Sequence, residues 1–368
     1  MSTTDASQIH DLRSALGFLR EMPGQLLETD TQVDPDAEVS GVYRHVGAGG
    51  TVMRPTKEGP AMVFNNVKGF DDAKVCIGML ASRKRVAALL DLDEEHLGLE
   101  IGKRFENLIA PEQIAGALRS RAVELADCVT VPQKCIANAE YVLEGYLMHD
   151  EAINEDVNGH GCAMPEFPGY TGGAKVCPVI KITAVTTRIN PIMESCIGPS
   201  HEHVSMAGIP TEASIYKMVE TAIPGRLLNV HAAPCGGGKF VAIMQFKKSS
   251  KNDEGRQRNA AMLAFSAFSE LKHVILVDED VDIFDMSDVM WAMTTRFQAD
   301  VDLITIPGCH CHVLDPSNDP AFDPSIREHG IACKAIFDCT APFNLKKNFI
   351  RSQFMEIDKD KWAAELAF

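Results

Sequence analysis

One carboxylate, Glu166, stands among residue types that shape a loop. Pro165 and Phe167 flank it, and three glycines follow within seven residues. Proline and glycine favour neither a helix nor a strand, so the pattern predicts an irregular loop over 158–173. A carboxyl group among methionine, proline, phenylalanine and tyrosine loses hydration, which favours its protonated form. Such a group can deliver a proton to a reacting atom. The same composition also suits a surface loop whose glutamate points into water.

Three further clusters could bind a ligand, and a structural role competes with each. The run Cys309–His312 alternates cysteine and histidine. On an extended backbone the two residue types face opposite ways, and the spacing is not that of a usual zinc site. The glycine-rich turn 235–239 lacks P-loop spacing, but it could bring Lys239 close to an anionic ligand. His201 and His203 share a face of period two, either as a ligand pair or as a solvated surface.

Composition narrows the class of protein. The chain has 368 residues, of which 45% are hydrophobic and 23% charged, which predicts a globular protein of two or three domains. A net charge of −16 argues against nucleic acid or an anionic membrane as a partner. Eleven cysteines, scattered and without CxxC pairs, indicate reduced thiols. With no signal peptide or membrane span recognised, we expect a cytoplasmic protein.

Alternating strand and helix patterns predict an α/β fold that positions these clusters. The N-terminal part, residues 1–110, is expected to form an α/β domain with strands at 60–64 and 75–79 and helices at 9–27, 82–90 and 91–99. The middle part, 111–190, is expected to hold strands of an antiparallel sheet at 122–131 and 139–147, followed by a strand at 179–186. The C-terminal part, 191–368, is expected to form a second α/β domain.

In that C-terminal domain we expect strands at 226–233, 239–246, 274–277 and 301–306 and helices at 211–222, 255–270 and 286–298. Thr211 is the expected N-cap of the first helix. The buried, parallel-type strand 274–277 ends in the acidic run 278–285. That run could hold a divalent metal, but we favour a structural role at the end of the strand.

Many separate stretches resemble the UbiD-type decarboxylases, most closely the branch that acts on protocatechuate and gallate. The likeness covers nearly the whole chain and includes residues 41–45, 47–51, 60–69, 139–145, 164–173, 208–214, 277–285, 291–296 and 314–317. The resemblance implies a non-oxidative carboxy-lyase for small aromatic acids that works as a homo-oligomer. It also implies prenylated FMN made by a flavin prenyltransferase, together with a divalent metal (Mn or Mg) and K+.

The resemblance also implies roles for single residues. Glu166 falls on the acid that protonates the carbon after CO2 has left. His203 and His312 fall on histidines that grip the ring hydroxyls, and Lys239 falls where a lysine approaches the cofactor. Cys162 stands where some relatives carry a further histidine at the substrate.

By the same resemblance, the chain lacks a segment between Pro111 and Ala115. In relatives that segment carries most of the flavin-binding barrel, the arginine partner of the acid and the metal ligands. Residues 111–190 are then the remnant of a split β-barrel. Two hypotheses follow: a hydroxybenzoate decarboxylase, or an inactive remnant or oligomerisation subunit that cannot hold flavin. A third, of another class, is a metal-dependent hydrolase that uses the Cys309–His312 cluster.

Overall fold

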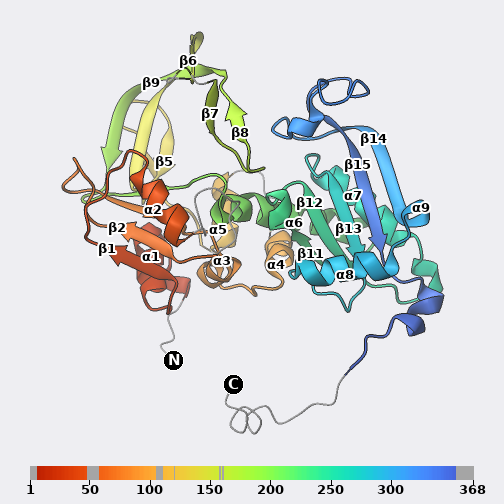
Figure 1. Cartoon of the computed structure of the whole chain (residues 1–368). Helices are drawn as coiled ribbons and strands as arrows, with labels where there is room; N and C mark the ends of the chain where they lie inside the picture. Colours follow the sequence, from red (N-terminus) through yellow and green to blue (C-terminus); the bar gives the residue numbers. More distant parts are fainter. Residues whose placement is uncertain are drawn as a thin grey trace.

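The computed structural model describes residues 6–47, 58–104, 111–119, 121–156, 159 and 161–353, without the side chains at 111–113 and 162–163. Most of the motif 47–51 therefore lies outside the described residues. Two α/β bodies lie on either side of the long helix α6 (His201–Ala222), and a curved ribbon of strands β6 and β9 rises above the N-terminal body (Figure 1). The predicted α/β class is confirmed. Among the described residues, no helix combines the length and apolar character needed to span a membrane.

The N-terminal body is a four-stranded sheet between helices. Its order is β1-β2-β3-β10, and its strands are β1 (Leu26–Thr29), β2 (Ala61–Phe64), β3 (Lys74–Ile77) and β10 (Ile192–Ser195). All four residues of β2 are buried, because α1 (Leu12–Arg20) packs on one face of the sheet and α2 (Glu38–Val46) on the other. The helix predicted over 9–27 is therefore shorter. It ends at Arg20, and Leu26 and Leu27 belong to β1.

Three helices and three separate two-stranded sheets follow. The helices are α3 (Arg83–Leu90), α4 (Leu97–Arg104) and α5 (Pro111–Leu118). The sheets pair β4 (Leu125–Asp127) with β5 (Lys134–Ile136), β6 (Tyr141–Asn154) with β9 (Val176–Thr187), and β7 (Cys162–Pro165) with β8 (Thr171–Gly173). The strands predicted at 122–131 and 139–147 do not share one sheet, and the first is reduced to β4. The turn after Cys128 closes a short hairpin of its own, with the Cys128 N–H donating to the Gln133 carbonyl, and β6 pairs with β9 instead.

The C-terminal body is a five-stranded sheet of order β11-β12-β13-β15-β14. Its strands are β11 (Leu227–Ala232), β12 (Val241–Phe246), β13 (His273–Val277), β14 (Leu303–His310) and β15 (Ile331–Cys339). The three central strands run parallel and both edge strands run antiparallel. Helices α6 and α7 (Arg256–Ala267) cover one face, and α8 (Met286–Arg296) covers the other. The short helix α9 (Ala299–Asp302) precedes β14. The parallel strand at 274–277 is confirmed, but β15 was not predicted.

Helix α6 starts ten residues before the predicted start. Ser200 is its N-cap, and the Ser200 side chain accepts from the His203 N–H at 3.2 Å. Thr211, the expected cap, lies inside the helix, where its Oγ1 donates to the Ala207 carbonyl. Pro210 also lies inside the helix. The remaining short elements are 3₁₀ turns at Ala6–Gln8, Pro234–Gly236, Lys251–Asp253, Pro316–Asn318 and Phe343–Phe349.

Candidate functional site

Glu166 lies at the start of a tight turn that joins β7 to β8. Its N–H donates to the Tyr170 carbonyl at 2.8 Å, and the Gly169 N–H donates back to the Glu166 carbonyl at 2.9 Å. Gly169 adopts φ +91°, a backbone conformation that side chains other than glycine rarely take. A Cβ at Gly172 would lie 2.9 Å from Glu166 Cγ, so this glycine makes room for the carboxylate arm. The predicted irregular loop is thus a β-hairpin, and Glu166 is half-buried.

Phe167 fixes the tip of this hairpin to the C-terminal body. It is 2% exposed, and its ring lies 4.9 Å from the His312 ring and 6.0 Å from the His203 ring, both edge to face. Lys239 Nζ lies 4.9 Å from the centre of the same ring. A Cβ at Gly237 would clash with Phe167, so the glycine-rich turn admits this ring. The hairpin that carries the acid therefore rests on three of the predicted site residues.

His203 belongs to the first turn of α6, next to its Ser200 cap. Burial lowers the pKa of His203, while the negative charge of Glu166 raises it and the positive charge of Lys239 lowers it further. Gly198 approaches the ring so closely that a Cβ there would lie 3.0 Å from His203 Nδ1. The net lowering of the pKa keeps His203 neutral at pH 7, with one ring nitrogen able to donate and the other able to accept.

His312 is also kept neutral, and its tautomer follows from its contacts. The Leu314 N–H donates to His312 Nδ1 at 3.0 Å, so the ring proton lies on Nε2. Burial lowers the pKa of His312, which the Glu270 carboxylate partly opposes. Glu270 Oε1 lies 3.8 Å from Nε2, and its Oε2 lies 3.1 Å from Lys239 Nζ. Glu270 thus links the lysine to the histidine, a role that no sequence pattern had indicated.

The structure therefore brings four of the predicted site residues together: Glu166, His203, His312 and Lys239. The side chain of Cys162, the fifth, lies outside the described residues. The expectation that His201 and His203 share one face is wrong. Both lie on helix α6, where residues two positions apart point to nearly opposite sides. His201 turns toward Glu58 instead, with 3.9 Å between His201 Nδ1 and Glu58 Oε1.

The other predicted clusters have structural contacts. Cys311 is fully buried, and its Sγ donates to the Glu270 carbonyl at 3.4 Å, whereas His310 is exposed. In the acidic run, Asp278 and Asp280 both pair with the buried Arg296. Within the ranges that the structure describes, no group of three or more His, Cys, Asp or Glu side chains is placed to hold a metal.

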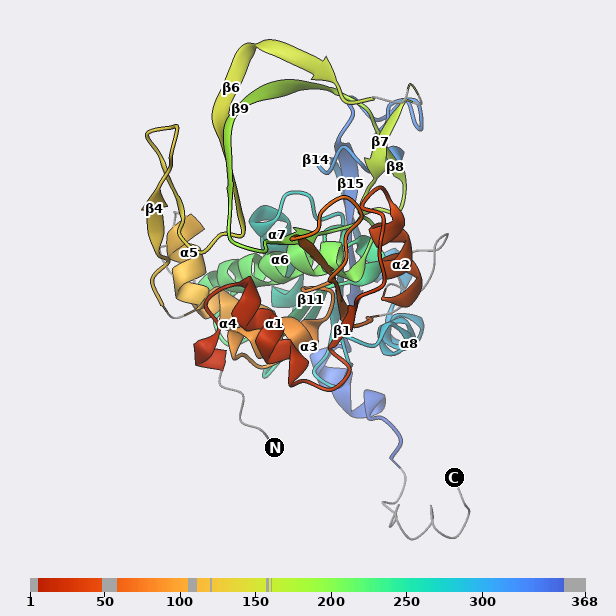
Figure 2. The same cartoon turned by 90° about the vertical axis from the view of Figure 1, so that its left-hand side faces the viewer.

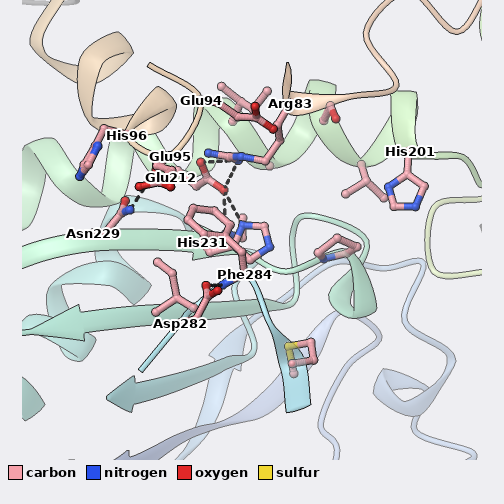
Figure 3. A pocket seen from close by; sticks show the side chains of 18 of the residues that line it. Arg83, Glu94, Glu95, His96, His201, Glu212, Asn229, His231, Asp282 and Phe284 are labelled. Atoms are coloured by element: carbon pink, nitrogen blue, oxygen red, sulfur yellow. Dashed lines mark hydrogen bonds and ion pairs between the residues drawn. The ribbon is translucent and has the colours of Figure 1, made fainter. Parts of the chain in front are cut away.

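A separate cleft of about 790 Å³ opens between the two bodies (Figure 3). At its base the fully buried carboxylate of Glu212 on α6 accepts from Arg83 of α3 at 2.8 Å and from the Ala232 N–H at 3.0 Å. His231 Nδ1 lies 3.1 Å from the same carboxylate. A Cβ at Gly98 would meet the Glu212 side chain, so α4 also packs closely here. Glu212 thus ties the N-terminal body to α6 and β11.

Comparison with known proteins decides the family. Models of the 3-octaprenyl-4-hydroxybenzoate carboxy-lyase match in three parts: the N-terminal domain over residues 18–105, the Rift-related domain over 110–201 and the C-terminal domain over 204–339. The chain belongs to the UbiD family. It is 43% identical to the gallate decarboxylase of Lactiplantibacillus plantarum over 481 positions, which cover 96% of this chain and 98% of that protein.

Solved structures agree with this membership. The apo 3,4-dihydroxybenzoic acid decarboxylase of Enterobacter cloacae superposes with a TM-score of 0.91 at 39% identity, covering 98% of this chain and 100% of that one. A UbiD-class enzyme of Pelotomaculum thermopropionicum, solved in complex with FMN, shares the fold at a TM-score of 0.80 and 24% identity, with coverages of 96% and 98%.

The alignment also shows that this UbiD chain is short. An alignment of 481 positions is at least 113 positions longer than a chain of 368 residues, so the gallate decarboxylase has that much sequence without a counterpart here. The region matched by the Rift-related model contains β6 and β9, which pair only with each other in the described chain. The described residues thus form no closed barrel around a flavin, and by themselves they provide no complete cradle for prenylated FMN.

Proposed function

We propose that this chain carries the acid and the ring-hydroxyl contacts of a hydroxybenzoate decarboxylase. The observation that carries the proposal is the meeting of Glu166, His203, His312 and Lys239 around the buried ring of Phe167. The relatives support the substrate class, because they are a gallate decarboxylase and a 3,4-dihydroxybenzoic acid decarboxylase. The reaction is the non-oxidative loss of CO2 from protocatechuate or gallate.

Each side chain has a defined task in this proposal. Glu166 delivers a proton to the ring carbon that CO2 leaves. The Leu314 N–H occupies Nδ1 of His312, so the ring proton lies on Nε2, which can donate to a ring hydroxyl oxygen in place of its 3.8 Å contact with Glu270. His203, which is neutral, can donate to or accept from a second hydroxyl. Lys239, which Glu270 holds in place, offers a positive charge to the carboxylate of the substrate or to another anion.

A second candidate has its own support. At least 113 alignment positions are missing, and the residues present form no flavin cradle. Both observations favour a catalytically inactive subunit that keeps the arrangement of the acid and histidines without turnover. The predicted divalent metal, K+ and flavin prenyltransferase belong to the first candidate alone.

One experiment separates the candidates. The chain is co-expressed with a flavin prenyltransferase, purified, and assayed by absorbance spectrum and by CO2 release from protocatechuate and gallate. The decarboxylase proposal expects bound flavin and turnover, with kcat at least about 100-fold lower in Glu166→Gln because the proton donor is removed. The matched control, Glu124→Gln on the exposed β4 side, is expected to keep full turnover. A folded, colourless protein without CO2 release overturns the proposal in favour of the inactive subunit.

A further inference from the structure

The ribbon of β6 and β9 presents one continuous apolar face to solvent. In its register Leu143 lies opposite Val185, Leu147 opposite Ile180, and Ile182 opposite Gly145. Residues that pair across the two strands point to the same side, and the register shift at Thr183 keeps Val185 on the side of Ile182, so the five large side chains share one face. We call these five side chains the ribbon face: Leu143, Leu147, Ile180, Ile182 and Val185. In that order they are 62%, 66%, 59%, 44% and 58% exposed.

The opposite side of the ribbon is polar and partly covered. There Glu144 is 3% exposed and accepts from the N–H groups of Val129 and Thr130 at 2.8 and 2.6 Å. Tyr146 and Lys181 follow on that side, again in register with each other. The turn between β4 and β5 therefore occupies the polar side. The ribbon face, in contrast, carries no charged residue.

The ribbon is held at its base and not by contacts of this face. Glu140, which directly precedes β6, accepts from Arg13 at 2.8 Å, from Arg188 at 3.1 Å and from the Ile192 N–H at 3.1 Å. These bonds tie the base of the ribbon, where β6 begins and β9 ends, to α1 and to β10. Figure 2 shows the two strands arching away from the helices beneath them. The ribbon is thus attached to the N-terminal body at its base, while the ribbon face stays exposed to solvent.

We propose that the ribbon face is an interface that packs against the same face of a second copy of this chain. A face without charges can be stacked on its twin across a two-fold axis without burying an unpaired ion. Two sheets packed in this way interdigitate their apolar side chains. Each of the five side chains contributes on the order of 100 Å² of apolar surface. Two copies together then bury on the order of 1,000 Å², which is the lower limit of area for a specific protein–protein interface.

The missing sequence explains why this face is open. The gallate decarboxylase has at least 113 positions that this chain lacks, and the ribbon lies in the region matched by the Rift-related model. Among the described residues, β6 and β9 pair only with each other, and the ribbon face is exposed, so it is available to another molecule. A second copy is present wherever the chain is present. The inference concerns association and does not rest on decarboxylation.

The test uses the full chain and two matched variants. Val185→Lys places a charge on the ribbon face, and Val301→Lys makes the same change on α9, where Val301 is 62% exposed. Sedimentation velocity over a hundredfold range of concentration measures self-association. Hydrogen exchange over the same range measures amide protection in β6 and β9. We expect the ribbon amides to gain protection as concentration rises, and Val185→Lys to weaken self-association at least tenfold.

Val301→Lys is expected to change neither measurement. Exchange in the C-terminal sheet serves as the folding control for both variants. Three results would overturn the proposal: ribbon amides that exchange equally fast at all concentrations, self-association that both variants leave unchanged, or a ribbon covered by a different co-purifying polypeptide. Because the readouts are mass and exchange, they stay informative even if the chain shows no turnover.

Discussion

Strands β13 and β9 are both rich in β-branched residues, yet they have opposite surroundings. β13 is buried at four of its five positions, between two parallel neighbours and under helices on both faces. β9 has one partner strand, and none of its twelve residues is buried. Local sequence makes both strands extended. Burial depends on which other segments the chain supplies, and that difference can be tested residue by residue.

The largest expected difference in the free energy of unfolding comes from truncating a leucine to alanine in each of the two strand regions. Leu276 of β13 is 0% exposed, so Leu276→Ala leaves a cavity and lowers the free energy of unfolding by about 2–5 kcal/mol. Leu147→Ala on the ribbon, where the leucine is 66% exposed, is expected to change it by less than about 0.5 kcal/mol. Urea denaturation of both variants, at a protein concentration low enough to keep the chain monomeric, measures the contrast. Equal losses would show that the ribbon is packed in the monomer.

A second prediction concerns the base of the ribbon. Glu140→Gln removes the charge that holds Arg13 and Arg188, which lowers the free energy of local opening of the ribbon by about 2–3 kcal/mol. Hydrogen exchange of β6 and β9 reports this opening, while exchange of β13 stays slow. Glu151→Gln at the exposed far part of β6 serves as the control and should leave exchange unchanged. Unaltered exchange in Glu140→Gln would mean that contacts other than this ion cluster hold the ribbon.

Acid should weaken the same anchor. Burial alone would raise the pKa of Asp11, but hydrogen bonds from the Ser14 N–H and from Arg188 lower it from 3.8 to about 2. A carboxyl with a lowered pKa stabilises the fold above its unfolded pKa, and that contribution is lost as pH falls from about 4 toward 2. The loss is about 2 kcal/mol. Urea unfolding at several pH values should show this loss in the wild type and not in Asp11→Asn.

The smallest expected effect is at the hairpin that carries the acid. Burial is the main cause of the lowered pKa of His203 and of His312, and Phe167 covers both rings. Phe167→Ala admits water, so both pKa values should rise by less than about one unit. Imidazole NMR titration measures the change. Phe322→Ala, at a residue that is 72% exposed, should leave both titrations alone, and a similar shift there would refute the assignment to Phe167.

Much of the C-terminal sheet could be predicted, because its parallel strands are short apolar runs with clear ends. Strand β15 could not be predicted, because Lys334 and Asp338 interrupt its apolar pattern. Both are buried, and their hydrogen-bond partners, the Ser269 carbonyl and Gln257, are far away in the sequence. The start of α6 was missed because Pro210 suggests a break in a helix. The proline lies inside the helix all the same, and Ser200 provides the cap.

In the candidate site, the family motifs selected Glu166, His203, His312 and Lys239, and the structure brings these residues together. No sequence pattern pointed to the role of Glu270 or to the ion pair between Arg83 and Glu212. Each depends on residues that are far apart in sequence: 129 positions separate Arg83 from Glu212. Strand pairing failed in the middle region for a related reason, because the partner of β6 lies beyond the whole β7–β8 hairpin.

The docking of Phe167 has one more consequence. The acid is carried by the middle region of the chain, but its position is set by a ring wedged among side chains of the C-terminal body. The hairpin that carries Glu166 therefore stays next to His203 and His312 in this shorter chain. The proposed acid and its two histidines thus stay together in a chain that lacks at least 113 positions of the gallate decarboxylase to which it is similar.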